Sequence, residues 1–172
     1  MKTYITEKDK KRIEAWTEAL VQEKIKKISK KEAIARIGLS YPVKGYGKHR
    51  IVFDLGKGKI LKLPRVRKGI RCNRNEVSLF QNSSSRMRKY LCKVVDSGHG
   101  WVVMKKMKTE VPRKKKYARQ LKKVYEKFLD KGVRISDLLT RRSKNPKWIN
   151  LRLDKKKDRV VLIDYANQYR RT

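Results

Sequence analysis

Near its start, the chain carries apolar residues at helical spacing among charged neighbours. The positions that form this stripe are Ile13, Trp16, Leu20, Ile25 and Ile28. Residues 6–9 (TEKD) have the composition of a capping box, which predicts a helix that begins there. A second capping box at 29–32 (SKKE) precedes a short apolar run and Gly38, so we expect a shorter helix that ends at this glycine. Both helices are expected to pack against the rest of the protein.

Between residues 51 and 63 the pattern changes to alternation, which is typical of strands. Apolar side chains alternate before the turn Gly56-Lys57-Gly58 and resume after it, so the segment predicts a β-hairpin. Further strands are expected over 91–95, 101–104, 149–153 and 159–163, with a short extended piece over 133–139. Further helices are expected over 73–81 and 117–129. The mixture predicts an α+β fold.

One lysine lies inside the second strand of the hairpin. Lys62 stands between Leu61 and Leu63, at a position otherwise suited to a core. A phosphate and a carboxylate as partners would explain it, whereas the alternative is an edge-strand lysine whose ammonium reaches solvent. Gly45 and Gly47 precede the hairpin and carry no Cβ, so their backbone can approach a ligand closely.

The composition limits the classes of partner. Lys+Arg 50 against Asp+Glu 16 gives a formal net charge of +34 over 172 residues. Such a charge attracts polyanions, so nucleic acid, nucleotide phosphates, acidic protein or anionic lipid are the candidates. Cys72 and Cys92 show no paired spacing, which argues against a disulfide framework or a zinc site. The absence of a long apolar run predicts a cytoplasmic protein without a membrane segment.

The order of charged residues along the chain suits phosphoryl transfer. Lys62 can neutralise phosphate charge, and Glu76 can hold this lysine as an ion pair. Asp164, expected at the end of a strand, can ligate Mg²⁺, with Asn150 as a second oxygen ligand. Asp137 can accept the proton of an attacking hydroxyl.

These motifs together resemble the protein kinase superfamily, in particular the small kinase-like proteins of bacteriophages and prophages. The matching segments span about residues 42–167 and are GYGKHRIVF, LKL, NRNEVSLF, VRISDLL and VVLIDYA. The resemblance implies a minimal, C-terminally truncated kinase-like fold with an upper lobe over 41–104, a reduced lower lobe over 105–172 and a helical extension over 1–40. It also implies ATP and Mg²⁺, with Gly45, Gly47, Lys62 and Met104 expected to bind the nucleotide.

Several positions depart from the family pattern. Arg50 replaces the third glycine of the loop, Ile135-Ser136 replaces the His-Arg before the catalytic aspartate, and Ala166 replaces a glycine. The gap between Asp137 and Asn150 is long, so Asn145 competes as the metal ligand. Since the sequence ends at Thr172, the helices that bind a peptide substrate in a full kinase are expected to be absent. We therefore expect an ATP- and Mg²⁺-dependent phosphotransferase of phage or prophage origin, with nucleotide binding better supported than transfer to a protein.

The alternative is a catalytically inactive kinase-like module that binds nucleic acid or an acidic host protein. Its expected contact surface consists of Arg113, Lys114, Lys115, Lys116, Arg119, Arg141 and Arg142. Such binding would depend steeply on salt. A third hypothesis is a helix-turn-helix over 28–40, although Pro42, Gly45 and Gly47 make a poor second helix.

Overall fold

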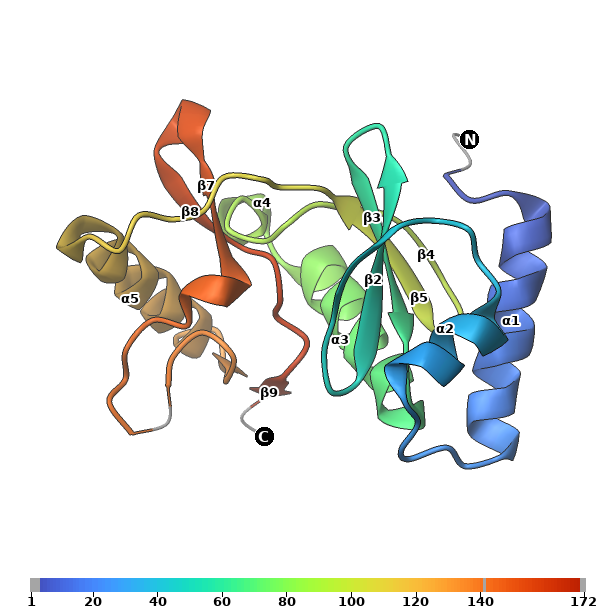
Figure 1. Cartoon of the computed structure of the whole chain (residues 1–172). Helices are drawn as coiled ribbons and strands as arrows, with labels where there is room; N and C mark the ends of the chain where they lie inside the picture. Colours follow the sequence, from blue (N-terminus) through green and yellow to red (C-terminus); the bar gives the residue numbers. More distant parts are fainter. Residues whose placement is uncertain (1–3, 141, 171–172) are drawn as a thin grey trace. The chain divides into compact units, whose positions relative to one another are not determined.

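The computed structural model describes residues 4–140 and 142–170 (Figure 1). The chain forms two compact units. Unit 1 comprises Met1–Val77 and Val94–Lys106, and unit 2 comprises Ser78–Lys93 and Met107–Thr172. The predicted phosphate-binding lysine and its glutamate belong to unit 1, whereas the predicted metal ligands and catalytic aspartate belong to unit 2.

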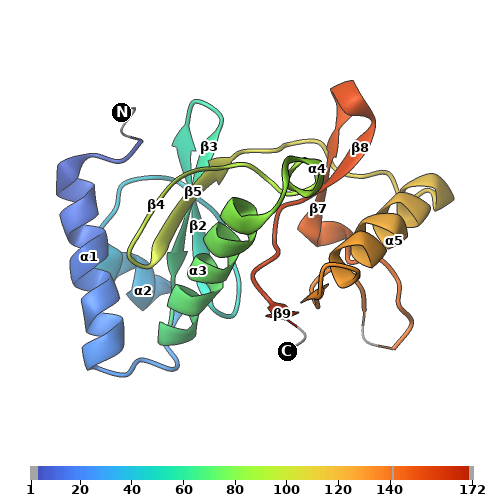
Figure 2. The ribbon, with the colours of Figure 1, turned by 180° about the vertical axis from the view of Figure 1, so that it is seen from behind.

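Unit 1 is built on one antiparallel sheet of five strands in the order β1-β2-β3-β5-β4. The strands are β1 (Val43–Tyr46), β2 (Arg50–Gly56), β3 (Lys59–Pro64), β4 (Val94–Gly98) and β5 (Trp101–Lys105). The helices are α1 (Glu7–Gln22), α2 (Lys30–Ile37) and α3 (Arg67–Asn82), the last of which continues into unit 2. Figures 1 and 2 show α2 and α3 on opposite sides of the sheet.

Local capping explains where the first two helices begin and end. The hydroxyl of Thr6 accepts a hydrogen bond from the amide of Asp9, and that of Ser29 accepts one from the amide of Glu32. Gly38 closes α2 in the left-handed region, with φ of 66°. Each cap satisfies an amide that the helix leaves without an internal partner.

The core of unit 1 lies between α1, α2 and one face of the sheet. Every second residue of the hairpin points into it. The buried side chains that meet there include Ile13, Trp16, Leu20, Ile37, Ile51, Phe53, Leu61, Leu63, Trp101 and Val103. The indole of Trp16 also donates a hydrogen bond of 2.8 Å to the carbonyl of Pro64, which ties α1 to the end of β3. The N-terminal helices are therefore part of the same core as the sheet.

Unit 2 contains two small antiparallel sheets and one long amphipathic helix. Its elements are α4 (Ser85–Arg88), α5 (Lys115–Leu129), β6 (Val133–Ile135), η1 (Trp148–Asn150), β7 (Leu151–Asp154), η2 (Lys155–Lys157), β8 (Arg159–Leu162) and β9 (Gln168–Arg170). Strand β6 pairs with β9, and β7 pairs with β8. Leu121, Val124 and Phe128 form the buried stripe of α5, as helical spacing requires.

Four expectations are corrected in detail. Helix α1 ends at Gln22, so Ile25 and Ile28 follow it outside the helix. Helix α3 begins at Arg67 rather than at 73, because basic residues on its exposed side hide its first turns. Strand β4 covers 94–98 instead of 91–95. A strand over 43–46 follows the second helix, so the helix-turn-helix hypothesis is wrong.

Candidate functional site

Lys62 lies in the middle of the five-stranded sheet. Strand β3 is flanked by β2 and β5, and Lys62 pairs with Val52 on one side and Val102 on the other. The residue is only 4% exposed. The alternative of a solvent-reaching lysine on an edge strand is therefore wrong. A buried ammonium requires a charged partner within the protein.

Glu76 on α3 is that partner. The ammonium of Lys62 donates hydrogen bonds of 2.9 and 3.0 Å to the two carboxylate oxygens of Glu76. The side chain of Glu76 is fully buried, and that of Lys62 is 5% exposed. The structure thus brings together the lysine and the glutamate that the sequence pairs. Their interaction also joins α3 to the centre of the sheet.

Two further residues complete this buried group. A guanidinium nitrogen of Arg50, in β2, donates to Glu76 at 2.7 Å and to the side-chain oxygen of Asn73 at 3.2 Å. Asn73 donates in turn to the backbone carbonyls of Lys62 and Gly100, at 3.0 and 2.7 Å. The residues Arg50, Lys62, Asn73 and Glu76 are called the Glu76 cluster below.

Sequence reasoning missed Arg50 and Asn73 as members of the site. The sequence analysis noted Arg50 only as the residue that replaces the third glycine of the loop. Arg50 nevertheless stands two residues before Val52, the cross-strand partner of Lys62. Residues two apart on a strand share a face, so this parity is a usable signal. Asn73 precedes Glu76 by three residues, which places both on one face of a helix.

The glycine loop connects β1 and β2. Gly45 pairs with Val52, and the amide of Gly47 donates to the carbonyl of Arg50 at 2.8 Å. A Cβ at either glycine would meet nothing within 4 Å, so open space surrounds both positions. Met104, the other predicted nucleotide-binding residue, is fully buried in β5.

His49 lies in the same loop. Burial lowers the pKa of His49, and the nearby cations Lys68, Lys48, Arg50 and Arg65 lower it further. Its Nδ1 has no hydrogen-bond partner among the described residues. These surroundings therefore favour the neutral imidazole over its charged form.

In unit 2, Asp137 follows β6 and is half-buried. The side-chain amide of Asn167 donates to one carboxylate oxygen of Asp137 at 2.5 Å, and the ammonium of Lys147 lies 3.4 Å from the other. The carbonyl of Asn167 accepts from the amide of Ser136 at 2.9 Å, which links the two segments a second time. The carboxylate of Asp137 is thereby held in a fixed orientation.

Asn150 lies beside Asp137. Its side-chain nitrogen donates to the backbone carbonyl of Asp137 at 2.7 Å, and its own carbonyl accepts from the amide of Ile163 at 2.9 Å. Ile163 directly precedes Asp164, which is half-buried. The structure therefore brings the segments of Asp137, Asn150 and Asp164 together in unit 2.

Asn145 lies elsewhere, in an exposed loop closed by its backbone hydrogen bonds to Thr140. This loop accounts for the long gap between the two predicted residues, Asp137 and Asn150. Among the described residues, no group of three or more His, Cys, Asp or Glu is placed to hold a metal ion. No helix in the described ranges is both long and apolar enough to span a bilayer.

Six of the seven residues of the predicted basic surface lie within the described part of the chain. Arg113, Lys114, Lys115, Lys116, Arg119 and Arg142 are exposed in unit 2. Arg141 lies outside the described residues. A cavity of about 420 Å³ in the same unit has a mainly apolar lining that includes Leu79, Met87 and Phe128 and no predicted site residue.

Comparison with known proteins supports the fold. A scan against protein-family models and a search of curated proteins give no match. Among solved structures, the bifunctional kinase-methyltransferase WbdD is similar with a TM-score of 0.55 and 14% sequence identity. The similarity covers 73% of this chain and 31% of the WbdD chain. The fold is thus kinase-like and α+β, whereas the phage or prophage origin stays a prediction.

Proposed function

We propose that the protein is a minimal phosphotransferase that uses ATP and Mg²⁺. The observation that carries this proposal is the buried ion pair of Lys62 and Glu76, within a kinase-like fold. A buried ammonium is costly unless it is paired, and replacement of the whole ion pair by apolar residues would often be neutral for stability. A function that requires a fixed cation gives a reason for its presence.

In this proposal the residues of each unit have separate roles. Lys62 neutralises charge on the nucleotide phosphates, and Glu76 keeps its ammonium in place. The open backbone around Gly45 and Gly47 covers the phosphates. In unit 2, Asp137 accepts the proton of the acceptor hydroxyl, with its carboxylate oriented by Asn167.

The donor set in unit 2 fits Mg²⁺. Asp164 offers carboxylate oxygens, and Asn150 offers its side-chain oxygen because its nitrogen is engaged by the carbonyl of Asp137. Oxygen ligands of this kind, completed by phosphate and water, are what Mg²⁺ prefers. When bound, the ion neutralises phosphate charge during transfer.

Calorimetry with ATP and Mg²⁺ tests the proposal. We expect the wild type to bind, and Lys62→Met and Asp164→Asn each to weaken binding roughly tenfold to hundredfold, since each removes a charged contact to the ligand. Lys26→Met removes an exposed lysine of unit 1 and serves as the matched control, which should bind like the wild type.

A double variant tests whether the effects of the two residues are coupled. If they are independent, Lys62→Met combined with Asp164→Asn weakens binding by the product of the single effects, and a departure from this product measures the coupling. Absence of ATP binding by the folded wild type would reject the phosphotransferase and favour the inactive module. Transfer of labelled phosphate to casein, histone, DNA or small hydroxyl compounds then surveys the acceptor.

A further inference from the structure

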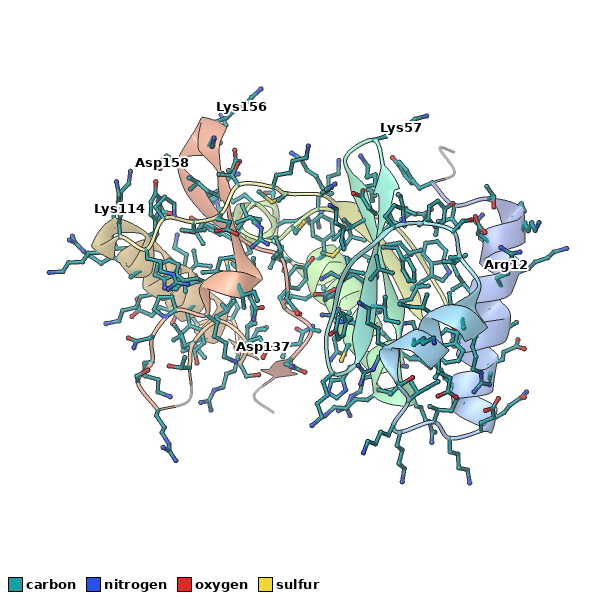
Figure 3. The ribbon with its side chains drawn as sticks, in the orientation of Figure 1. Arg12, Lys57, Lys114, Asp137, Lys156 and Asp158 are labelled. Atoms are coloured by element: carbon teal, nitrogen blue, oxygen red, sulfur yellow. The ribbon has the colours of Figure 1, made fainter. Side chains whose placement is uncertain are left out.

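Exposed cations gather where the first turn of α5 meets the β7–β8 turn in unit 2. The residues are Arg113, Lys114, Lys115, Lys116, Lys155, Lys156 and Lys157. They are called the unit 2 basic surface below. Figure 3 shows Lys114, Lys156 and Asp158 in the same part of unit 2, with Lys156 pointing outward from the tip of the hairpin.

Specific side-chain contacts hold the two segments together. The carboxylate of Asp158 pairs with the ammonium of Lys116 and accepts a hydrogen bond of 2.8 Å from the hydroxyl of Tyr117. The side-chain nitrogen of Gln120 donates to the carbonyl of Asp158, and its oxygen accepts from the amide of Val160, both at 2.9 Å. We call Lys116, Tyr117, Gln120 and Asp158 the Asp158 clamp. The clamp holds two segments side by side that lie 40 residues apart in the sequence, so their side chains form one continuous surface.

Helix stability does not explain the lysines at the start of α5. Lys114 occupies the N-cap without a side-chain cap, and the first turn contains no acidic residue. Cations are disfavoured there by the helix dipole. Helices α1 and α2 of the same chain instead use Thr6 and Ser29 as caps and carry acids in their first turns. Helix α3 likewise begins with the cations Arg67 and Lys68 and no acid, so helix capping accounts for the charges of neither helix.

The surroundings of the surface indicate which polyanion it fits. The exposed large apolar residues among those described are Val21, Tyr46 and Ile149, none of which belongs to the basic surface. A membrane contact or a protein interface would need apolar side chains at its centre. Single-stranded nucleic acid would need aromatic rings for stacking, but Tyr117 is buried and its hydroxyl is bound by Asp158.

We infer that the unit 2 basic surface binds the phosphate backbone of double-stranded nucleic acid without reading its base sequence. Lysine and arginine side chains on two rigidly joined segments suit phosphates spaced along a duplex. The inference is independent of nucleotide binding in unit 1, so it stands or falls separately from the phosphotransferase.

Binding of a 24-base-pair DNA duplex of mixed sequence, measured by fluorescence anisotropy over a range of salt concentrations, tests this inference. The variant K155Q/K156Q/K157Q should bind at least tenfold more weakly at low salt and lower the slope of log K against log salt by about 2–3. The matched control K11Q/K26Q/K27Q removes the same charge from exposed positions in unit 1. It should leave both quantities close to those of the wild type.

A neutral variant tests the clamp. Gln120→Ala removes both hydrogen bonds of this side chain without changing the charge, and we expect a severalfold loss of duplex affinity. Equal losses for the two triple variants would show a general effect of net charge and overturn the inference. Tighter binding to single-stranded DNA, polyglutamate or vesicles of anionic lipid than to the duplex would also overturn it, as would no binding at all. A second probe, an RNA duplex of the same length, should bind comparably.

Discussion

The Glu76 cluster of unit 1 and the Asp158 clamp of unit 2 each use one carboxylate to hold several donors. In the Glu76 cluster the carboxylate is fully buried, and the side chains of Lys62 and Arg50 are 5% and 10% exposed. In the clamp, the side chains of Lys116 and Asp158 are 59% and 49% exposed. Similar chemistry therefore operates in two different dielectric environments.

This difference decides what each group contributes. Water screens the exposed pair and solvates either partner when the other is lost, so its contribution to stability is small. Within the Glu76 cluster, loss of one partner leaves a charge that neither water nor protein solvates. The buried cluster is thus critical to the fold of unit 1, whereas the clamp chiefly positions the hairpin beside α5.

Replacing the buried carboxylate should have the largest effect. We expect Glu76→Gln to lower the free energy of unfolding of unit 1 by about 3–5 kcal/mol, because it leaves two buried cations without their shared acceptor. Urea denaturation in a Trp148→Phe background reports unit 1, since Trp16 and Trp101 both lie there. Glu18→Gln, on the exposed side of α1 in unit 1, is the control and should change stability by under about 0.5 kcal/mol. A small effect of Glu76→Gln would contradict the contrast between the two groups.

Removing one of the two cations should cost less. We expect Arg50→Met to destabilise unit 1 by about 1.5–3 kcal/mol, because Glu76 keeps Lys62 but loses its bond of 2.7 Å to the guanidinium. Arg50→Lys should restore part of this loss. The same urea measurement checks both variants. Equal stability of Arg50→Met and wild type would show that Lys62 alone positions the glutamate.

The close contact between the start of α3 and the hairpin can be tested by a substitution at Gly69. A Cβ at Gly69 would lie 2.3 Å from the carbonyl oxygen of His49 and 2.8 Å from the Cα of Pro64. These are backbone atoms that cannot move aside locally, so Gly69→Ala should displace the start of α3 and cost about 1–3 kcal/mol. Gly47→Ala, where a Cβ has open space, is the control. Thermal unfolding of the two variants should separate them.

The smallest effect is expected at the clamp, and it should depend on pH. Hydrogen bonds from Lys116 and Tyr117 lower the pKa of Asp158 below its usual value. An acid with a lowered pKa in the folded state contributes stability above its unfolded pKa, and this contribution is lost as the pH falls through the lowered value. Asp158→Asn should therefore be slightly less stable than wild type at pH 6, and this difference should be smaller at about pH 3. Denaturation at both values measures this, and a difference that does not shrink in acid would refute the assigned cause.

Local signals predicted much of unit 1. Caps at Thr6 and Ser29, the closing Gly38 and the tight turn at 56–58 each act within a few residues, so they can be read directly from the sequence. The start of α3 at Arg67 could not, because the exposed basic residues Arg67, Lys68 and Arg71 dominate the sequence of its first turns.

The site was predicted in part for a similar reason. Lys62 and Glu76 are unusual at their positions and therefore visible, whereas Arg50 depends on the register of the hairpin. That register shifts at an irregularity between Asp54 and Gly56, so counting from the turn gives the wrong face. In unit 2, the sequence suggested both Asn145 and Asn150, and only the path of the intervening loop separates them in space.

The packing of α1 and α2 on the sheet has a practical consequence for expression of this protein. The resemblance to kinases begins near residue 42, which invites a shortened fragment that starts there. Such a fragment would present Ile51, Phe53, Leu61 and Leu63 to water, because these side chains now lie under the two helices. Exposed apolar strands associate with one another. A shortened fragment would thus accumulate as inclusion bodies, and assays of it would say nothing about the intact chain.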